Sequence, residues 1–396
     1  MAESIYEKQW RLGKKLGRLM PEPVKKLIRV ATIISAKIVP GSFRNIGVPK
    51  STITCDDIPH QDIYPPDVLH LKPPKTVHEK TYRKHEILEM PMPGSCVIKL
   101  RNGISSPLPA TITAEGKLLF DASKHYSMDG EYDHSLFSHP CMFPDITHHE
   151  GSIATITSEA QDCYYHWIYE VLPRIHLIKQ AGIKVDQLYT EYSKRFQQET
   201  LEILGYNAED VIPALENKFI SADELIVTSI PCKVNSPNHW ICKFLRDTFI
   251  PQADQSLDGD FDRIYVSRPK TIQRKVINED EVYAVLKEYG FRRVFMEDYD
   301  FRQQVKIFNS AKVIVAPHGA ALTNIIWCEK GTKLIEFASP KYISRSYWIL
   351  SNLINIDYYY FFADGEHPAD FKPEYIQEDI NCNISRLKDT LKLAGL

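Results

Sequence analysis

The regular alternation of short apolar stretches with helical patterns between residues 263 and 361 most strongly constrains the fold of this chain. Apolar stretches that predict buried strands occupy residues 263–267, 292–296, 312–316, 333–337 and 358–361. Helical patterns lie between them, at residues 279–289, 301–310, 320–327 and 344–353. Strands and helices that alternate at this spacing form a parallel sheet with helices on both faces. The sequence therefore predicts an α/β fold with a parallel sheet in its C-terminal part.

The turn after the third of these strands has the composition of a phosphate-binding turn. Residues 317–324 read Pro-His-Gly-Ala-Ala-Leu-Thr-Asn. A strand that enters a helix through a glycine turn leaves backbone N–H groups unpaired at the sheet edge, where the helix dipole also favours an anion. The residues assigned to this site are Pro317, His318, Gly319, Ala320, Ala321 and Asn324. A capped turn without a ligand is the alternative, because short motifs often match by chance.

Further polar residues follow neighbouring strands at the same edge of the predicted sheet. Ser267 and Arg268 end the first strand, and Arg274 lies a few residues further on. An arginine can bind phosphate through two parallel N–H donors. Glu336, at the fourth strand, could accept hydrogen bonds from the hydroxyls of a nucleotide ribose. Taken singly, each of these side chains could instead be a solvated surface group.

A helical pattern at residues 163–181 carries a second group of polar residues. His166, Glu170 and Arg174 are spaced four residues apart and therefore share one face of a helix. A carboxylate one turn from an imidazole could orient it as a general base. Pro173 requires the helix to bend or to start nearby. A buried His–Glu pair with a purely structural role is the alternative.

Composition divides the chain into three parts. We predict a basic amphipathic arm at residues 1–50, an N-terminal domain at 51–253 and a C-terminal domain at 254–396. The polar segment 254–260 is the expected linker. Residues 40–95 are rich in proline, which predicts an extended connection with little regular structure.

The N-terminal arm is basic, whereas the remainder of the chain is acidic. Residues 1–45 contain ten Lys or Arg against three Glu, a net charge of +7, and the whole chain has −3. Leu27, Ala31, Ile34 and Ile38 recur at helical spacing. This pattern is typical of a helix that lies on an anionic membrane surface. An amphipathic helix packed on its own domain would give the same pattern.

The cysteines and the start of the chain indicate the compartment. The eight cysteines form no CxxC pair, which predicts reduced thiols in the cytoplasm. The longest uncharged run near the start, residues 30–36, is too short for a signal peptide. We expect a cytoplasmic protein, peripheral on the inner face of the plasma membrane. The slightly acidic total charge argues against a nucleic-acid partner.

Two patterns resemble metal sites, but neither predicts one. Asp298-Tyr-Asp300 has the form of a DxD metal motif and falls in a loop after a strand. The loop at residues 121–150 contains His125, Asp133, His134, His139, Cys141, His148 and His149. Their irregular spacing favours solvation or capping. We therefore expect no essential metal and no cofactor, and the lack of GxGxxG argues against a dehydrogenase.

Several motifs, taken together, resemble glycosyltransferase family 61, the capsular-polysaccharide type. They are Tyr165-His-Trp, Glu170, Leu-Pro-Arg174, Tyr265-Val-Ser-Arg268, Arg274, Asn278-Glu-Asp-Glu-Val282, Tyr289-Gly-Phe291, residues 316–324, residues 331–336 and Tyr347-Trp348. Their order is kept over residues 150–365, and residues 44–50 look like part of the bacterial branch. The resemblance implies the GT-B architecture, in which two Rossmann-like domains face each other across a cleft.

The resemblance also implies a nucleotide-sugar donor and inversion at the anomeric carbon. It makes residues 51–253 the acceptor-side domain and residues 254–396 the nucleotide-sugar-binding domain. We expect the donor diphosphate on residues 317–322, with Arg268 and Arg274 neutralising its charge in place of a metal ion. His166 is the expected base and Glu170 its orienter or substitute. Acceptor binding is assigned to Arg174, Tyr347 and Trp348.

The predicted protein is an inverting hexosyl- or pentosyltransferase that extends a glycan or lipid-linked glycan in cell-surface polysaccharide synthesis. A nucleotide-sugar epimerase on the same fold is one alternative, and it would need no acceptor. A non-catalytic, nucleotide-sensing subunit of an assembly complex is the other. It would bind the donor without turnover.

Overall fold

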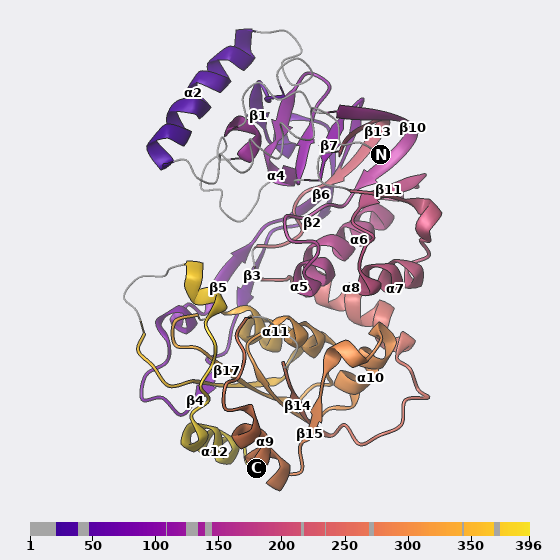
Figure 1. The fold of residues 1–396 in the computed structure, drawn as a ribbon. Coiled ribbons are helices and arrows are strands. Elements are labelled where there is room, and N and C mark those ends of the chain that lie inside the picture. Colours follow the sequence, from indigo (N-terminus) through magenta and orange to yellow (C-terminus); the bar gives the residue numbers. More distant parts are fainter. Residues whose placement is uncertain are drawn as a thin grey trace, which may run out of the picture. The chain divides into compact units, whose positions relative to one another are not determined.

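The structure, a computed structural model, describes ten stretches of the chain. These are residues 21–38, 47–107, 109–123, 134–138, 145–214, 218–233, 235–268, 273–342, 344–367 and 373–396. They form two compact units (Figure 1). Unit 1 contains the described residues up to Pro66 and those of Pro93–Pro231, and unit 2 contains those of Asp67–Met92 and Cys232–Leu396. The expected linker, residues 254–260, lies within unit 2.

Unit 1 is built on a mixed ten-stranded sheet. Its strands are β1 (Ser51–Ile53), β2 (His60–Tyr64), β6 (Ser95–Arg101), β7 (Ile104–Ser106), β8 (Ala110–Ile112), β9 (Lys117–Leu119), β10 (Asp145–Thr155), β11 (Gln187–Thr190), β12 (Val211–Pro213) and β13 (Lys218–Thr228). Strands β13, β10, β11 and β12 are neighbours in that order and run parallel. Strands β6 and β7 pair antiparallel with β13. These four strands form a continuous parallel part of the sheet, and β1 and β9 form a separate parallel pair.

The helices of unit 1 lie between these strands and before them. They are α2 (Glu22–Ile38), α4 (Phe120–Ser123), α5 (Tyr164–His166), α6 (Leu172–Gln180) and α7 (Arg195–Ile203), with a π-helical turn η4 (Trp167–Val171) and 3₁₀ turns η1 (Cys55–Asp57), η3 (Ser135–Ser138) and η5 (Ala208–Asp210). The segments α5, η4 and α6 follow one another directly after β10. They therefore carry their side chains past the carboxyl end of that strand.

Unit 2 confirms the predicted parallel sheet. Its strands are β14 (Arg263–Val266), β15 (Arg292–Val294), β16 (Val313–Pro317), β17 (Lys333–Ala338), β18 (Asp357–Phe362) and β4 (Lys75–Thr76). Strands β3 (Asp67–His70) and β5 (Glu89–Met92) form a separate two-stranded antiparallel sheet. The order β15-β14-β16-β17-β18-β4 is parallel throughout. Among the five strands that follow residue 262 this is the doubly wound order 2-1-3-4-5.

Helices cover both faces of the unit 2 sheet. They are α8 (His239–Phe249), α9 (Glu279–Glu288), α10 (Phe301–Ser310), α11 (Ser346–Ile354) and α12 (Ile384–Leu393), with 3₁₀ segments η2 (Arg83–Glu86), η6 (Ile250–Gln252), η7 (Met296–Asp298), η8 (Ala320–Trp327) and η9 (Pro373–Gln377).

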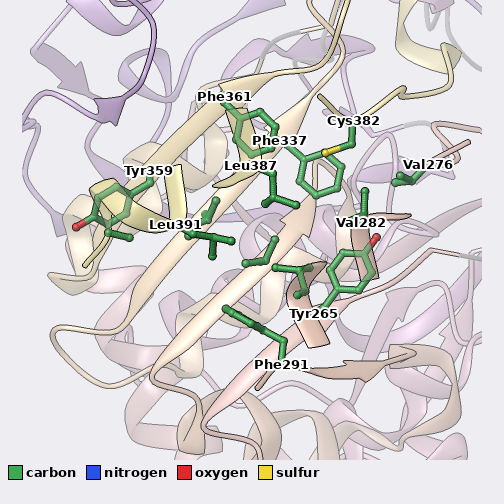
Figure 2. Close-up of a cluster of buried hydrophobic side chains, with 14 of the residues drawn as sticks. Tyr265, Val276, Val282, Phe291, Phe337, Tyr359, Phe361, Cys382, Leu387 and Leu391 are labelled. Atoms are coloured by element: carbon green, nitrogen blue, oxygen red, sulfur yellow. The ribbon is translucent and has the colours of Figure 1, made fainter. Parts of the chain in front are cut away.

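One apolar core joins the sheet of unit 2 to α9 and α12 (Figure 2). Val282 and Leu286 of α9 and Leu387 and Leu391 of α12 are buried against alternate strand residues such as Phe337. Burying an aliphatic side chain of this size stabilises the fold by about 1.5–3 kcal/mol. The apolar period of each helix therefore fixes which of its faces meets the sheet.

Two expectations about local structure were wrong. Residues 40–95 contain strands β1 to β5 where they are described, because their extended backbone finds partners such as β6, β9 and β18. The helix expected at residues 320–327 is 3₁₀, with the Leu322 N–H donating to the Gly319 carbonyl at 3.0 Å. Its tighter turns stack residues three apart, as in the hydrogen bond from Trp327 Nε1 to Asn324 Oδ1.

Candidate functional site

The strand order of unit 2 marks one place on its sheet for ligand binding. The chain leaves β14 for β15 on one side and returns to β16 on the other, so β14 and β16 are neighbours that lead in opposite directions. In doubly wound sheets, ligands bind outside the carboxyl ends of such a strand pair. Ser267 and Arg268 follow β14 there, and His318 and Gly319 follow β16. The structure therefore brings together the two predicted parts of the donor site.

Arg268 lies directly over Gly319. A Cβ added to Gly319 would collide with the Arg268 guanidinium, whose Cζ would lie 2.7 Å away. Gly319 has an extended backbone that any residue can adopt (φ 176°). Close approach of Arg268, and not backbone conformation, therefore requires glycine at this position.

Arg268 and Arg274 form a region of concentrated positive charge. Burial and the charge of Arg274 lower the pKa of Arg268 to about 10. Arg274 lies over the Tyr342 ring, 5.3 Å from its centroid, and donates to the Ile376 carbonyl. Its backbone is left-handed (φ 53°), a conformation that costs a non-glycine residue of order 1–3 kcal/mol. An anion between the two guanidiniums would relieve their repulsion.

The glycine turn itself offers backbone donors. Because η8 is a 3₁₀ helix with Gly319 as its N-cap, the N–H groups of Ala320 and Ala321 have no acceptor within the helix. Both residues are partly exposed. The His318 N–H, by contrast, donates to the Phe337 carbonyl and extends the sheet. The turn can therefore present at least two N–H groups to an anion.

His318 is held from behind by a buried carboxylate. Its Nδ1 lies 2.5 Å from Glu336 Oε1, and Tyr358 donates to Glu336 Oε2 at 2.7 Å. The imidazole lies against the rings of Tyr342 and Tyr347, and Tyr347 donates to the Gly319 carbonyl at 2.7 Å. A carboxylate at Nδ1 fixes the orientation of the ring and leaves Nε2 as the nitrogen that could contact a ligand.

Several residues predicted to touch a ligand make hydrogen bonds within the protein, and their contacts with a ligand stay predictions. Glu336 is 3% exposed and faces His318 and Tyr358, so ribose binding by its carboxylate stays a prediction that this geometry does not favour. Ser267 donates to Glu279 at 2.5 Å. Asn324 donates to Gln304. Trp348 donates to the Lys72 carbonyl from a fully buried position.

The second predicted group lies at the carboxyl edge of the unit 1 sheet. His166 Nδ1 lies 2.7 Å from Glu170 Oε1, and Ser158 Oγ donates to Glu170 Oε2 at 2.6 Å. Glu170 is buried, whereas the His166 side chain keeps 16% of its surface exposed. With Glu170 ionised, its carboxylate could only accept hydrogen bonds, so Nδ1 would be the donor and Nε2 the nitrogen that could take a proton.

The turn that presents this pair is π-helical. Trp167–Val171 forms one wide turn directly before Pro173, which occupies the first turn of α6. Pro173 has no N–H, so one helical hydrogen bond is missing, and the wider turn before it accommodates this loss. A helix that bends or starts near Pro173 was the expectation from the sequence. Such single π turns are frequent at functional sites.

The Arg174 side chain is buried and contacts the neighbouring strand β13. It is 3% exposed and donates from Nη1 to the Thr228 carbonyl and hydroxyl at the end of β13, each at 3.3 Å. Its Nε donates to the Glu170 carbonyl. We therefore expect Arg174 to hold the helix against the sheet, and its acceptor contact stays a prediction.

The two metal-like patterns differ in how much of them is described. Asp300 N-caps α10, accepting from the Gln303 N–H at 2.8 Å, and Asp298 lies in η7. In the loop, His125, Asp133, His139 and Cys141 lie outside the described residues, whereas the ring of His134 is buried. Within the described part of the chain, no group of three metal-capable side chains comes together. The seven cysteines described there are free thiols.

Sequence reasoning missed three residues that shape these sites: Ser158, Tyr342 and Tyr358. Ser158 follows β10, whose residues 145–152 are too polar to predict a strand. Tyr342 lies in the loop after β17, where its position at a strand end could have indicated it. Tyr358 belongs to a strand of almost uniform aromatic composition, so no alternation shows which face it takes.

Fold and site together define an α/β protein with polar residues gathered at the carboxyl ends of two sets of parallel strands. Within that broad class, residues 164–335 match the family model described as Glycosyltransferase 61. The match includes His166, Glu170, Arg268 and Gly319 and confirms the family resemblance over this span. It supports a general glycosyltransferase role, with a sugar donor and an acceptor as substrates. A comparison with curated proteins gave no significant match.

Proposed function

We propose that this protein is an inverting glycosyltransferase that transfers a sugar from a nucleotide-sugar donor to a glycan or lipid-linked glycan of the cell surface. The contact between Arg268 and Gly319 at the strand pair β14/β16 is the observation that carries this proposal. It brings the Arg268 guanidinium, near the charge of Arg274, to a turn whose first N–H groups have no acceptor within η8, an arrangement suited to a diphosphate. The family match over both sets of site residues gives it a reaction class.

The proposed reaction is a single displacement. The acceptor hydroxyl oxygen forms a bond to the anomeric carbon, while the bond from that carbon to the donor phosphate oxygen breaks and the nucleoside diphosphate keeps the electron pair. His166 takes the acceptor proton on Nε2, and Glu170 holds Nδ1. Arg268, Arg274 and the η8 N-terminus stabilise the charge that develops on the leaving group.

The proposed base, His166, belongs to unit 1, whereas Arg268 and Gly319 of the proposed donor site belong to unit 2. We therefore propose the GT-B arrangement, with unit 1 supplying the base and unit 2 the donor site. Because the positive charges of Arg268 and Arg274 would stabilise the leaving group, a metal ion would be dispensable. The proposed setting is the cytoplasm, where nucleotide sugars would reach the donor site.

Nucleotide binding tests the donor site. A thermal shift with nucleoside diphosphates and nucleotide sugars should stabilise the protein, by about 2.7 kcal/mol at a concentration 100 times the Kd. Arg268→Ala should abolish the shift, whereas Arg302→Ala, on the exposed side of α10, should keep it. A shift that survives Arg268→Ala would reject the donor site.

Turnover tests the base. His166→Ala should lower kcat by about 10²–10⁴ with little change in donor affinity, and Glu170→Gln should cost less if it only orients the ring. His176→Ala on the same helix, which loses a hydrogen bond to Tyr64, is the matched control. If Glu170→Gln is the more damaging change, the carboxylate is the base, and if neither lowers kcat, His239 is the next candidate.

The same assays separate the alternatives. Free nucleotide released only in the presence of a sugar acceptor indicates transfer. Conversion of the sugar without an acceptor indicates an epimerase. Donor binding without either indicates a sensing subunit.

A further inference from the structure

Helix α2 (Glu22–Ile38) exposes an apolar stripe to solvent. Val24, Leu27, Val30, Ile34 and Ile38 are 43–75% exposed, and Ala31 between them is exposed as well. At 3.6 residues per turn these positions fall within about a third of the helix circumference. Large side chains gathered on one face in this way mark an interaction surface, whereas scattered ones do not.

The partner of α2 within unit 1 leaves this stripe uncovered. The helix lies near η3 (Ser135–Ser138), whose Leu136 and Phe137 are buried in a separate core with Phe219 and Val48. Among the described residues, no other helix or strand exposes a group of large apolar side chains. Of the large hydrophobic side chains exposed in the described residues, five lie on α2, and Val68, Ile87, Ile277 and Leu393 come from four other places.

The charge around the stripe indicates what would cover it. The helix contains Lys25, Lys26, Arg29 and Lys37 against Glu22, a net charge of +3, within an N-terminal region of net charge +7. Lys26 is exposed. An exposed apolar face on a helix of net positive charge fits the boundary between acyl chains and acidic headgroups, where each basic residue near the surface adds about fivefold to the affinity.

Length decides how the helix would meet a bilayer. Seventeen residues of α2, four of them basic, cannot serve as a span, and no helix within the described stretches is long and apolar enough to cross a membrane. We infer that α2 binds the surface of an anionic lipid bilayer, lying in the plane of the headgroups with the stripe inward. The inference is independent of the proposed reaction, since it uses no residue of either site.

Vesicle flotation with the full chain tests this surface. The protein should float with phosphatidylcholine vesicles that contain phosphatidylglycerol and not with phosphatidylcholine alone, and salt should weaken the binding. Leu27→Ser/Ile34→Ser should lower the vesicle affinity at least about tenfold, and Lys26→Gln about fivefold at low salt. Leu393→Ser, an exposed apolar residue on α12, is the matched control and should bind as the unchanged protein does.

Other results would overturn the inference. Flotation of the Leu27→Ser/Ile34→Ser protein equal to that of the unchanged chain would place membrane binding elsewhere. Equal binding to neutral vesicles, or none to either kind, would remove the role of acidic lipid. A dimer in sedimentation that this variant lacks, without vesicle binding, would assign the stripe to a second copy of the chain.

Discussion

Gly319 and Arg268 show how two residues 51 positions apart define one site. The glycine is needed because a guanidinium occupies the space where its side chain would be, and its backbone is extended. Sequence alone suggests a glycine turn and a nearby arginine, but not their contact. The affinity for a diphosphate should therefore depend on both residues together.

Gly319→Ala should weaken nucleoside diphosphate binding at least about tenfold while changing the stability of unit 2 by less than about 1 kcal/mol, because the new methyl group displaces only the end of a flexible side chain. Titration calorimetry and urea unfolding measure the two effects. In the Arg268→Ala background the same change should cost nothing more. Additive losses would mean that Gly319 acts without Arg268.

His85 is a buried histidine whose two ring nitrogens have no hydrogen-bond partner among the residues that the structure describes. It lies among aromatic rings, 4.8 Å from both Trp348 and Tyr360 between centroids. Burial, and next the charge of Arg345, lower its pKa to about 4. The native protein therefore keeps this ring neutral where the unfolded chain would protonate it.

This difference predicts a pH dependence of stability. Below pH 6.5 the unfolded chain gains a proton that native His85 refuses until about pH 4, so stability should fall as the pH falls through this window. Between pH 7 and 5 the loss should be about 2 kcal/mol, and His85→Phe should remove it. Urea unfolding at both pH values measures this, with exposed His70→Ala as the control. An unchanged pH slope in His85→Phe would contradict it.

Helix ends and interruptions carry the chemistry at the scale of elements. The wide turn Trp167–Val171 positions His166 and Glu170 in the helical segment after β10. The 3₁₀ form of η8 leaves the N–H groups of Ala320 and Ala321 without an acceptor in the helix. Pro173 made the first irregularity predictable, whereas nothing in residues 320–327 distinguished a 3₁₀ helix from an α-helix. Both irregularities lie at strand carboxyl ends.

Asp300 provides a test of whether the Asp-Tyr-Asp sequence is a cap or a metal site. Asp300→Ala should destabilise unit 2 by about 0.5–2 kcal/mol through the lost cap, while Asp298→Ala, at an exposed position at the end of η7, should change stability less. Thermal unfolding measures both. Glycosyl transfer should survive EDTA in every variant. Loss of activity with chelator and in both variants, with rescue by Mn²⁺, would make the pair a metal site.

At the scale of the whole molecule, a segment from the first quarter of the chain completes unit 2. Strand β4 extends the parallel sheet beyond β18. The same segment accepts a hydrogen bond from Trp348 at the Lys72 carbonyl and gives one from the Tyr82 N–H to Tyr360. Figure 1 shows β4 beside the strands of this unit. Residues 67–92 are therefore part of its fold and not only a connection.

A fragment of residues 232–396 should unfold at a lower urea concentration than the same fragment with residues 67–92 fused ahead of it, because it lacks β4 and these hydrogen bonds. Chemical unfolding followed by circular dichroism measures the midpoints. A fusion with a shuffled version of residues 67–92 is the control. Equal midpoints for all three would show that the segment contributes nothing to the stability of unit 2.

The sequence by itself determined the parallel sheet of unit 2, the helix α10 to the residue, and the residues that the family match covers. These depend on local periodicity and on short motifs, which are written within ten to twenty neighbouring residues. It also indicated α2 and its apolar stripe, since a helical period is local.

Only the tertiary structure decided which of the candidate residues lie close together. It set Arg268 over Gly319, turned Glu336 toward His318 and Tyr358, and buried Arg174 and Trp348 against backbone carbonyls. It also paired β4 with β18 across more than 280 residues. Such contacts form between segments that are far apart in the sequence. Their free energy depends on loop closure and on the packing context, and no local sequence pattern encodes either of these.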